Sequence, residues 1–151
     1  IDEQIEENNK MFNPMGVYIE SLACNSNGAL IYVYRPKFLE RDFSDGRVAE
    51  FMSQYGYNTE DSKKAVERLK ERIRQLEDFP HEIGVFLGYD LDDTIAFLNK
   101  DKKCLYTGYW KVYSDLEKKL QTFLMFTNCR NNLLEMISKG FSLEGIMERM
   151  I

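Results

Sequence analysis

His81 is the only histidine of this 151-residue chain and stands beside Glu82 in the stretch FPHEIGVFLGY, residues 79–89. An imidazole titrates near neutral pH, so it serves as a proton donor, a ligand contact or a plain hydrogen-bonding group. Adjacent residues of a strand point to opposite faces, which disfavours an acid–base pair made of His81 and Glu82. We expect His81 to begin a strand and to make a local hydrogen bond, with ligand contact and catalysis as the alternatives.

A second group of residues with chemical potential is GYWKVY, residues 108–113, in which Lys111 lies among aromatic residues. If this stretch is a strand, Tyr109, Lys111 and Tyr113 share one face, and Trp110 lies on the other. The lysine is then either an edge residue that extends its ammonium group into water, or a contact for a carboxylate or a phosphate.

The charged residues of the two stretches also have a purely structural explanation. Pairing of the stretches as neighbouring strands would bring Glu82 within reach of Lys111 and neutralise both side chains. Arg35 and Arg72 would extend such a cluster, because guanidinium groups bind carboxylates through two parallel hydrogen bonds. The sequence leaves open whether Lys111 contacts a ligand or an internal carboxylate.

Several motifs of enzymes and metalloproteins are missing from the chain. It contains no GxGxxG or GxxxxGK[ST] phosphate loop, no GxSxG nucleophile turn and no HExxH zinc motif. One histidine and three isolated cysteines, Cys24, Cys104 and Cys129, do not make a closed zinc site at ordinary spacing. We therefore predict neither a structural metal nor a disulfide, and the sequence identifies no cofactor.

The pattern of apolar residues predicts the elements that must position these groups. A helix over 59–76 is indicated by a stripe at spacing i, i+3, i+4, formed by Ala65, Val66, Leu69, Ile73 and Leu76. The opposite face of this helix, which includes Lys70, is expected to be solvated. Other expected elements are strands at 29–35, 82–89 and 104–113, the last broken near Gly108, and helices after Pro36, over 45–55, after the capping sequence DLDD at 90–93, over 115–139 and over 142–151.

This order of elements predicts a single α+β domain over residues 1–151, with a small mixed or antiparallel sheet of about three strands covered by helices. The net charge of −5 and the interleaving of basic with acidic residues disfavour nucleic acids and membranes as partners. No apolar run approaches the ~20 residues of a membrane span, and dispersed cysteines suit a reducing compartment. We therefore expect a cytoplasmic protein.

The stretch FPHEIGVFLGYDLDDTIAFL, followed by GYWKVY, resembles a bacterial family of unknown function, domain-of-unknown-function family thirty-seven ninety-three. Members of that family typically read PHEIGxFLGYPxxDVxxFI and then GYWKVY, and the similarity extends more loosely over most of the chain. Asp90 stands where the family usually has proline. The cysteine-containing N-terminal segment of the family is also missing, so we expect the chain to lack an N-terminal segment of the full-length protein.

The resemblance implies no reaction, because the family has no established activity. It implies instead that the two matching stretches contribute to one shared pocket, since both begin or end where strands terminate. The candidate ligand-binding residues are His81, Glu82, Tyr89, Trp110, Lys111 and Tyr113.

We expect the protein to be a module that binds a small molecule or a protein partner. One alternative is an enzyme that uses His81 with Lys111. The other is an accessory partner of a redox protein, for which the acidic surface and the free cysteines would be suited.

Overall fold

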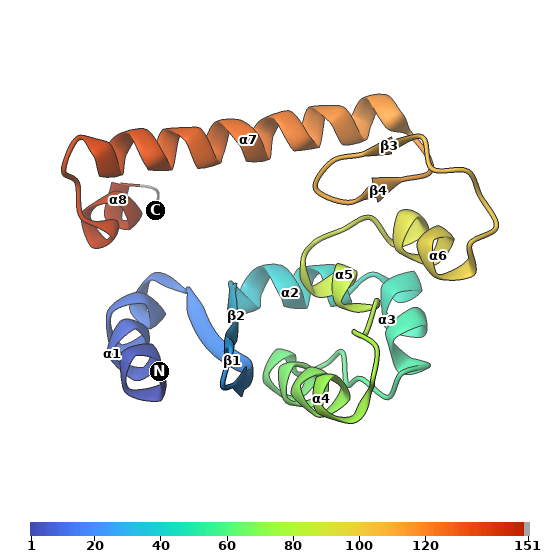
Figure 1. Cartoon of the computed structure of the whole chain (residues 1–151), viewed down its shortest axis with the longest axis horizontal. Coiled ribbons are helices and arrows are strands. Elements are labelled where there is room, and N and C mark those ends of the chain that lie inside the picture. The colour runs from blue at the N-terminus through green and yellow to red at the C-terminus, as the bar shows by residue number, and fades with distance from the viewer. Residues whose placement is uncertain (150–151) are drawn as a thin grey trace. The chain divides into compact units, whose positions relative to one another are not determined.

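The computed structural model describes residues 1–149 and divides into two compact units. The first unit comprises Ile1–Gly88, and the second begins at Tyr89. Figure 1 shows a hairpin among several short helices in the first unit, and a smaller hairpin beside the long helix α7 (Leu116–Ser138) in the second. Helices accompany small antiparallel sheets in both units, which confirms the predicted α+β class.

The elements of the first unit are α1 (Asp2–Phe12), a 3-10 turn η1 (Asn13–Met15), β1 (Tyr18–Asn25), β2 (Gly28–Tyr34), α2 (Pro36–Phe43), α3 (Gly46–Ser53), α4 (Ser62–Gln75) and α5 (Ile83–Phe86). Those of the second are α6 (Leu91–Asn99), β3 (Tyr106–Thr107), β4 (Lys111–Val112), α7 and α8 (Leu143–Arg149). In place of one sheet of about three strands, the described strands form two separate hairpins. None of the described helices is both long and apolar enough to cross a lipid bilayer.

The β1–β2 hairpin reverses at a polar two-residue turn, Ser26 and Asn27. The Asn25 side chain accepts a hydrogen bond from the Asn27 main-chain N–H at 2.8 Å. Gly28 follows with a φ of 145°, a backbone conformation that residues with a Cβ atom rarely adopt. The strand predicted at 29–35 is thus confirmed as β2, whereas β1 was not predicted.

Aromatic side chains fill the core of the first unit. Tyr32 and Tyr34 of β2 are buried and stack with their ring centroids 4.7 Å apart. The Phe86 ring meets Tyr32 edge-on at 6.2 Å, and the Phe86 carbonyl oxygen accepts a hydrogen bond from the Tyr32 hydroxyl at 2.6 Å. Stacked and edge-on aromatic pairs are favourable beyond the area they bury, so these contacts hold α5 against the hairpin.

Helix α4 has the apolar stripe that the sequence predicts. Asp61 caps its N-terminus by accepting hydrogen bonds from two main-chain N–H groups of the first turn. Leu76 of the predicted stripe lies beyond Gln75, the last helical residue, and is 41% exposed. The fully buried stripe residues are Ala65, Val66 and Leu69.

The face of α4 opposite this stripe is not uniformly solvated. The Lys70 side chain is only 16% exposed. Its ammonium group lies 2.8 Å from a carboxylate oxygen of Glu20 on β1 and 2.8 Å from one of Glu67. The expectation of a solvated face at Lys70 is therefore wrong, because this residue connects the helix to the neighbouring strand.

The strand predicted over 82–89 is wrong, because Ile83–Phe86 form a helical turn, α5. The main-chain N–H groups of Ile83, Gly84 and Val85 donate to carbonyl oxygens three residues earlier. A short apolar run that is buried on all sides has no periodicity that would separate a strand from a helix. Without this strand, the expected pairing of the two stretches does not form.

The strand predicted over 104–113 is two short strands that pair with each other. β3 and β4 are antiparallel, and Thr107 faces Lys111. Gly108 lies in the turn between them, where an added Cβ atom would stand only 2.4 Å from the Phe123 ring of α7. The break predicted at Gly108 is therefore a reversal of the chain, and the close approach of α7 requires glycine there.

The long helix α7 agrees with the prediction over 115–139 to within one residue at each end. Gly140 follows with a φ of 87°, as expected of a residue that ends a helix. In the turn before α8, the Ser142 hydroxyl accepts a hydrogen bond from the Gly145 N–H at 3.1 Å and so caps the helix. The last two residues of the helix predicted over 142–151 lie outside the described residues.

Candidate functional site

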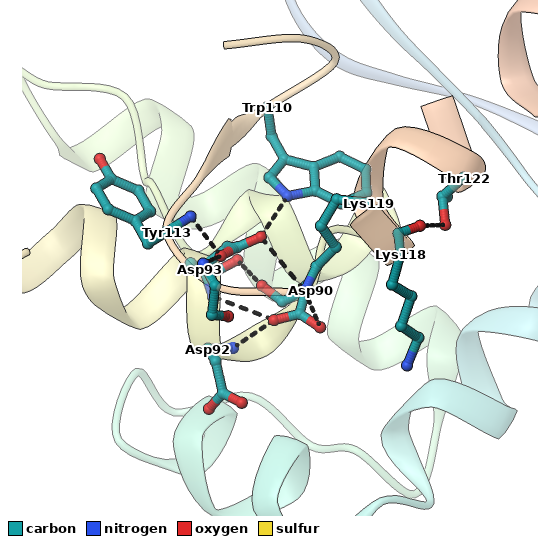
Figure 2. A network of polar contacts seen from close by, with 10 residues as sticks. Asp90, Asp92, Asp93, Trp110, Tyr113, Lys118, Lys119 and Thr122 are labelled. Carbon is teal, nitrogen blue, oxygen red and sulfur yellow. Dashed lines mark hydrogen bonds and ion pairs between the residues drawn. The ribbon is translucent and has the colours of Figure 1, made fainter. Parts of the chain in front are cut away.

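Four polar residues converge in the second unit: Asp90, Asp93, Trp110 and Lys119, which we call the Asp93 cluster (Figure 2). They come from the start of α6, the β3–β4 turn and the first turns of α7. Asp93 is 1% exposed and Lys119 is 4% exposed. Three segments of the chain therefore meet at one buried carboxylate.

Both oxygens of the Asp93 carboxylate accept hydrogen bonds. Oδ2 accepts from the indole Nε1–H of Trp110 at 2.8 Å. Oδ1 accepts from the main-chain N–H groups of Tyr113 at 2.8 Å and Ser114 at 3.2 Å. A carboxylate buried without such partners would destabilise the fold, so these bonds fix the orientation of the indole and the position of the chain after β4.

Lys119 offsets part of the buried negative charge. Its Nζ atom lies 3.2 Å from Asp90 Oδ2 and 3.7 Å from Asp93 Oδ2. Asp90 also caps α6 by accepting hydrogen bonds from the main-chain N–H groups of Asp92 and Asp93, as the sequence DLDD predicts. Because Asp93 and Lys119 are both buried, the cluster positions three elements and presents neither side chain to solvent.

Aromatic rings surround Trp110. Tyr89 stacks on the indole at 5.0 Å, and Phe123 of α7 meets it edge-on at 4.6 Å. Trp110 is 8% exposed and forms the core of the second unit with Val112 and Phe123. Two of the candidate residues, Tyr89 and Trp110, are thus in direct contact.

The other two candidates of the second unit, Lys111 and Tyr113, flank the buried Val112 in the chain. Lys111 is exposed, and its ammonium group lies 5.5 Å from the centroid of the Phe97 ring on α6. Tyr113 is half-buried, and burial raises the pKa of its phenol. Tyr109 lies in the turn and packs edge-on against Phe126 of α7 at 5.3 Å, so the expectation that it shares a strand face with Lys111 is wrong.

The remaining candidates, His81 and Glu82, belong to the first unit. Glu82 is 2% exposed, and its Oε1 accepts a hydrogen bond from the Tyr57 hydroxyl at 3.0 Å. The same oxygen forms an ion pair with the guanidinium group of Arg72. His81 has an exposed side chain, and its carbonyl oxygen accepts a main-chain hydrogen bond from Gly84 at the start of α5.

The Glu82 contacts join the last turn of α4 to α5. Burial raises the pKa of Tyr57, and the neighbouring Glu82 carboxylate raises it further. Arg72 also lies over the Tyr55 ring at 5.0 Å. Arg35 is used elsewhere, since its Nη1 donates to the Met15 carbonyl oxygen at 2.8 Å. The internal partner of Glu82 is therefore Arg72.

A different group of residues is exposed along α7. We call this group the α7 surface; it consists of four apolar residues of the N-terminal half of α7 and one residue of the β3–β4 turn, each at least 38% exposed, namely Leu120, Leu124, Met125, Phe126 and Tyr109. Successive residues of a helix are rotated by about 100°, so the run FLMF at 123–126 surrounds the helix axis with apolar side chains. Only Phe123 of this run is buried. This surface was not predicted, although the FLMF run at 123–126 was the signal for it.

Among residues 1–149, no three metal-binding side chains lie close enough to hold an ion. Cys24, Cys104 and Cys129 are free thiols. A depression of about 500 Å³ at the start of α7 is lined by Asp115, Leu116, Glu117, Lys118 and Gln121. None of the six candidate residues lines this depression.

A family model with the description "Protein of unknown function (DUF3793)" matches residues 1–147. This match includes residues of both units and confirms the family resemblance inferred from the sequence. Searches of curated proteins and of solved structures find no match to the chain. The family description names no activity, so function has to be argued from the residues and their surroundings.

Proposed function

We propose that this chain, which belongs to the DUF3793 family of proteins of unknown function, is a protein-binding module that holds its partner along α7. The observation that carries the proposal is the α7 surface, on which Leu124 is 60% exposed and Met125 is 64% exposed. Apolar side chains grouped on the surface of a folded protein mark interaction sites. Methionine and aromatic residues, of which this surface has three, are enriched in such interfaces.

The geometry of α7 supports a helical or similarly elongated partner. In Figure 1, the β3–β4 hairpin lies near the N-terminal part of α7, and α8 lies near its other end. Beyond the α7 surface, Leu134 is 57% exposed and Ile137 is 43% exposed. Leu120 and Leu124 lie four residues apart, and Leu134 and Ile137 lie three residues apart. Apolar side chains at such intervals along a helix bind the apolar stripe of a partner helix.

The candidate pocket residues support a small-molecule site less well. Trp110 uses its only polar group, the indole N–H, on Asp93. Glu82 is engaged by Tyr57 and Arg72. A ligand site needs polar groups whose hydrogen-bonding capacity is still unused. We therefore favour the partner-binding alternative, and we place the module in the cytoplasm because free cysteines suit a reducing compartment.

Site-specific photo-crosslinking in cells that make the whole chain tests this function. A photoreactive phenylalanine derivative replaces Met125 in one protein and Asn131, an exposed polar residue of α7, in the matched control. We expect the Met125 position to give a discrete protein adduct that the Asn131 position does not give. Adding Leu124→Glu should reduce the yield of this adduct while changing the free energy of unfolding by no more than about 0.5 kcal/mol, because Leu124 is exposed.

The outcomes of this experiment separate the alternatives. An adduct with a second copy of the chain would identify the protein as its own partner through α7. Identical adducts from Met125 and Asn131 would indicate random collision, and absence of adducts from both positions would indicate that α7 holds no partner. Either of these two results would contradict the proposed function.

A further inference from the structure

The two edges of the β1–β2 hairpin differ. On the β1 edge, the Asn9 side chain accepts a hydrogen bond from the Ile19 N–H at 2.9 Å and donates one to the Ile19 carbonyl oxygen at 2.8 Å. The main chain of Ile19 therefore points away from β2, which makes its pair with Val33 a non-hydrogen-bonded pair. The main-chain groups of Val33 consequently point away from β1, toward the outer edge of β2.

Every second residue of β2 has the same orientation as Val33. Ala29, Ile31 and Val33 thus direct their N–H and C=O groups to the outer edge. Within residues 1–149, no hydrogen bond from another segment reaches the main chain of these three residues. Their side chains are accessible as well, since Ile31 is 40% exposed and Val33 is 59% exposed.

This edge lacks the features that usually keep strands of monomeric proteins apart. Edge strands are commonly protected by a charged side chain, a proline or a bulge. The sequence of β2, GALIYVY, contains no charged residue and no proline. The irregularity in the pairing lies on the other strand, between Ser21 and Ala23 of β1. An uncharged, regular edge with β-branched side chains is suited to pair with another strand.

We propose that β2 pairs in antiparallel orientation with β2 of a second copy of the chain, so that the two hairpins form one four-stranded sheet about a two-fold axis. With Ile31 opposite the same residue of the second copy, Ala29 faces Val33 and Val33 faces Ala29. All outward N–H and C=O groups of the three residues then meet, and the two copies exchange about six main-chain hydrogen bonds. No like charges are brought together, because neither strand is charged.

The side chains of β2 favour a second copy over an unrelated extended peptide. Ala29, Ile31 and Val33 lie on one face of the strand, and Ile19 of β1 is directly beside Val33 on that face. The two-fold pairing joins this apolar face to the identical face of the second copy. β-branched side chains placed directly opposite each other across antiparallel strands stabilise the pairing.

Sedimentation velocity and amide hydrogen exchange of the whole protein at increasing concentration test the pairing. We expect the mass to rise from 17.8 kDa to twice that value. The amide hydrogens of Ile31 and Val33 should exchange more slowly as the dimer forms, because they then donate to the second copy. Exchange at Tyr32, whose N–H already faces β1, should change much less and serves as the internal control.

Variants of β2 sharpen this test. Ile31→Pro removes an outward N–H and no bond within the hairpin, so it should raise the dimer dissociation constant by about tenfold or more through the loss of two symmetric hydrogen bonds. Val33→Thr keeps the N–H and the β-branched shape and should leave the dimer intact. If Ile31→Pro does not fold, Val33→Lys replaces it, since a lysine beside the axis disfavours pairing while the strand stays regular.

Three results would overturn the proposal. The first is a monomeric mass at all concentrations with fast exchange at Ile31 and Val33, and the second is protection of these amides in a protein of monomeric mass. The third is a dimer whose dissociation constant is changed neither by Ile31→Pro nor by its replacement Val33→Lys. Met125→Glu, on the α7 surface, should have no effect on this dimer. Failure of the β2 pairing is therefore distinguishable from failure of the partner site on α7.

Discussion

At the scale of single residues, Tyr34 is unusual because its hydroxyl group is buried without a hydrogen-bond partner in the described part of the chain. Its neighbour Tyr32 is also buried, but the Tyr32 hydroxyl donates to the Phe86 carbonyl oxygen. A buried polar group without a partner destabilises a fold by about 1–3 kcal/mol. The Tyr34 hydroxyl therefore opposes folding, while its ring contributes to the aromatic core.

Tyr34→Phe is expected to leave stability at neutral pH unchanged or to raise it by up to about 1 kcal/mol, and to reduce the loss of stability in alkaline solution. Burial, followed by nearby Glu20, raises the pKa of Tyr34 from 10.0 to about 12. The folded protein therefore retains this proton while the unfolded chain releases it. This difference leaves the free energy of unfolding unaffected below pH 10 and lowers it as the pH rises toward 12, by about 1.4 kcal/mol per pH unit.

Urea denaturation at neutral pH and at about pH 11 measures this effect in the parent protein and in Tyr34→Phe. The difference in the free energy of unfolding between the two pH values should be smaller in the variant. Equal differences in the two proteins would show that Tyr34 titrates normally and would refute its assignment as a buried phenol.

At the scale of elements, Lys119 connects α7 to the start of α6 through Asp90 and Asp93. Lys119→Met removes the only cation that these carboxylates contact in the described chain and leaves Asp93 as a buried charge. We expect the free energy of unfolding to fall by about 3–5 kcal/mol, as for other buried ion pairs that lose one member. Chemical denaturation followed by the fluorescence of Trp110, the only tryptophan, measures this change.

The neighbouring Lys118 is exposed and provides the matched control. Lys118→Met should change the free energy of unfolding by no more than about 0.5 kcal/mol. Comparable losses from the two substitutions would mean that the Asp93 cluster does not stabilise the second unit through Lys119.

Elements whose signals are local were predictable from the sequence. The Asp61 cap and the apolar stripe define α4, and Gly140 marks the end of α7. α5 was not predictable, because Val85 and Phe86 are buried in a run without polar residues to set a period. β1 was not predicted because Glu20 interrupts the apolar residues of this strand. The Glu20 carboxylate is paired with Lys70 of α4, which is distant in the sequence.

The candidate site was predictable to a similar extent. The contact of Tyr89 with Trp110 joins two stretches that the sequence analysis selected. The bond between Asp93 and Trp110 was not predicted, because Asp93 also has a sufficient local explanation as a negative charge in the first turn of α6. A signal for Lys119 was present: it occupies an inward position of α7 between apolar turns, where a lysine needs a buried carboxylate.

At the scale of the whole molecule, charge is divided unequally between the two units. Residues 1–88 contain 16 acidic and 11 basic residues, which accounts for the entire net charge of −5. Residues 89–151 contain nine of each. The α7 surface therefore belongs to an electrically neutral unit, and the acidic character of the chain lies in the unit that contains the β1–β2 hairpin. A partner of α7 is held by apolar contact and gains little from long-range attraction.

The salt dependence of partner binding follows from this division. Raising the salt concentration from about 0.1 M to about 1 M shortens the Debye length from about 10 Å to about 3 Å and weakens contacts between exposed charges. The yield of the photo-crosslinked adduct at Met125, measured in extracts of the same cells, should stay constant or increase over this range, because apolar burial is not screened. A decrease of the adduct yield by about tenfold or more over this range would contradict the apolar mode of binding. A salt dependence of that size is typical of ionic contacts, such as those made with nucleic acids.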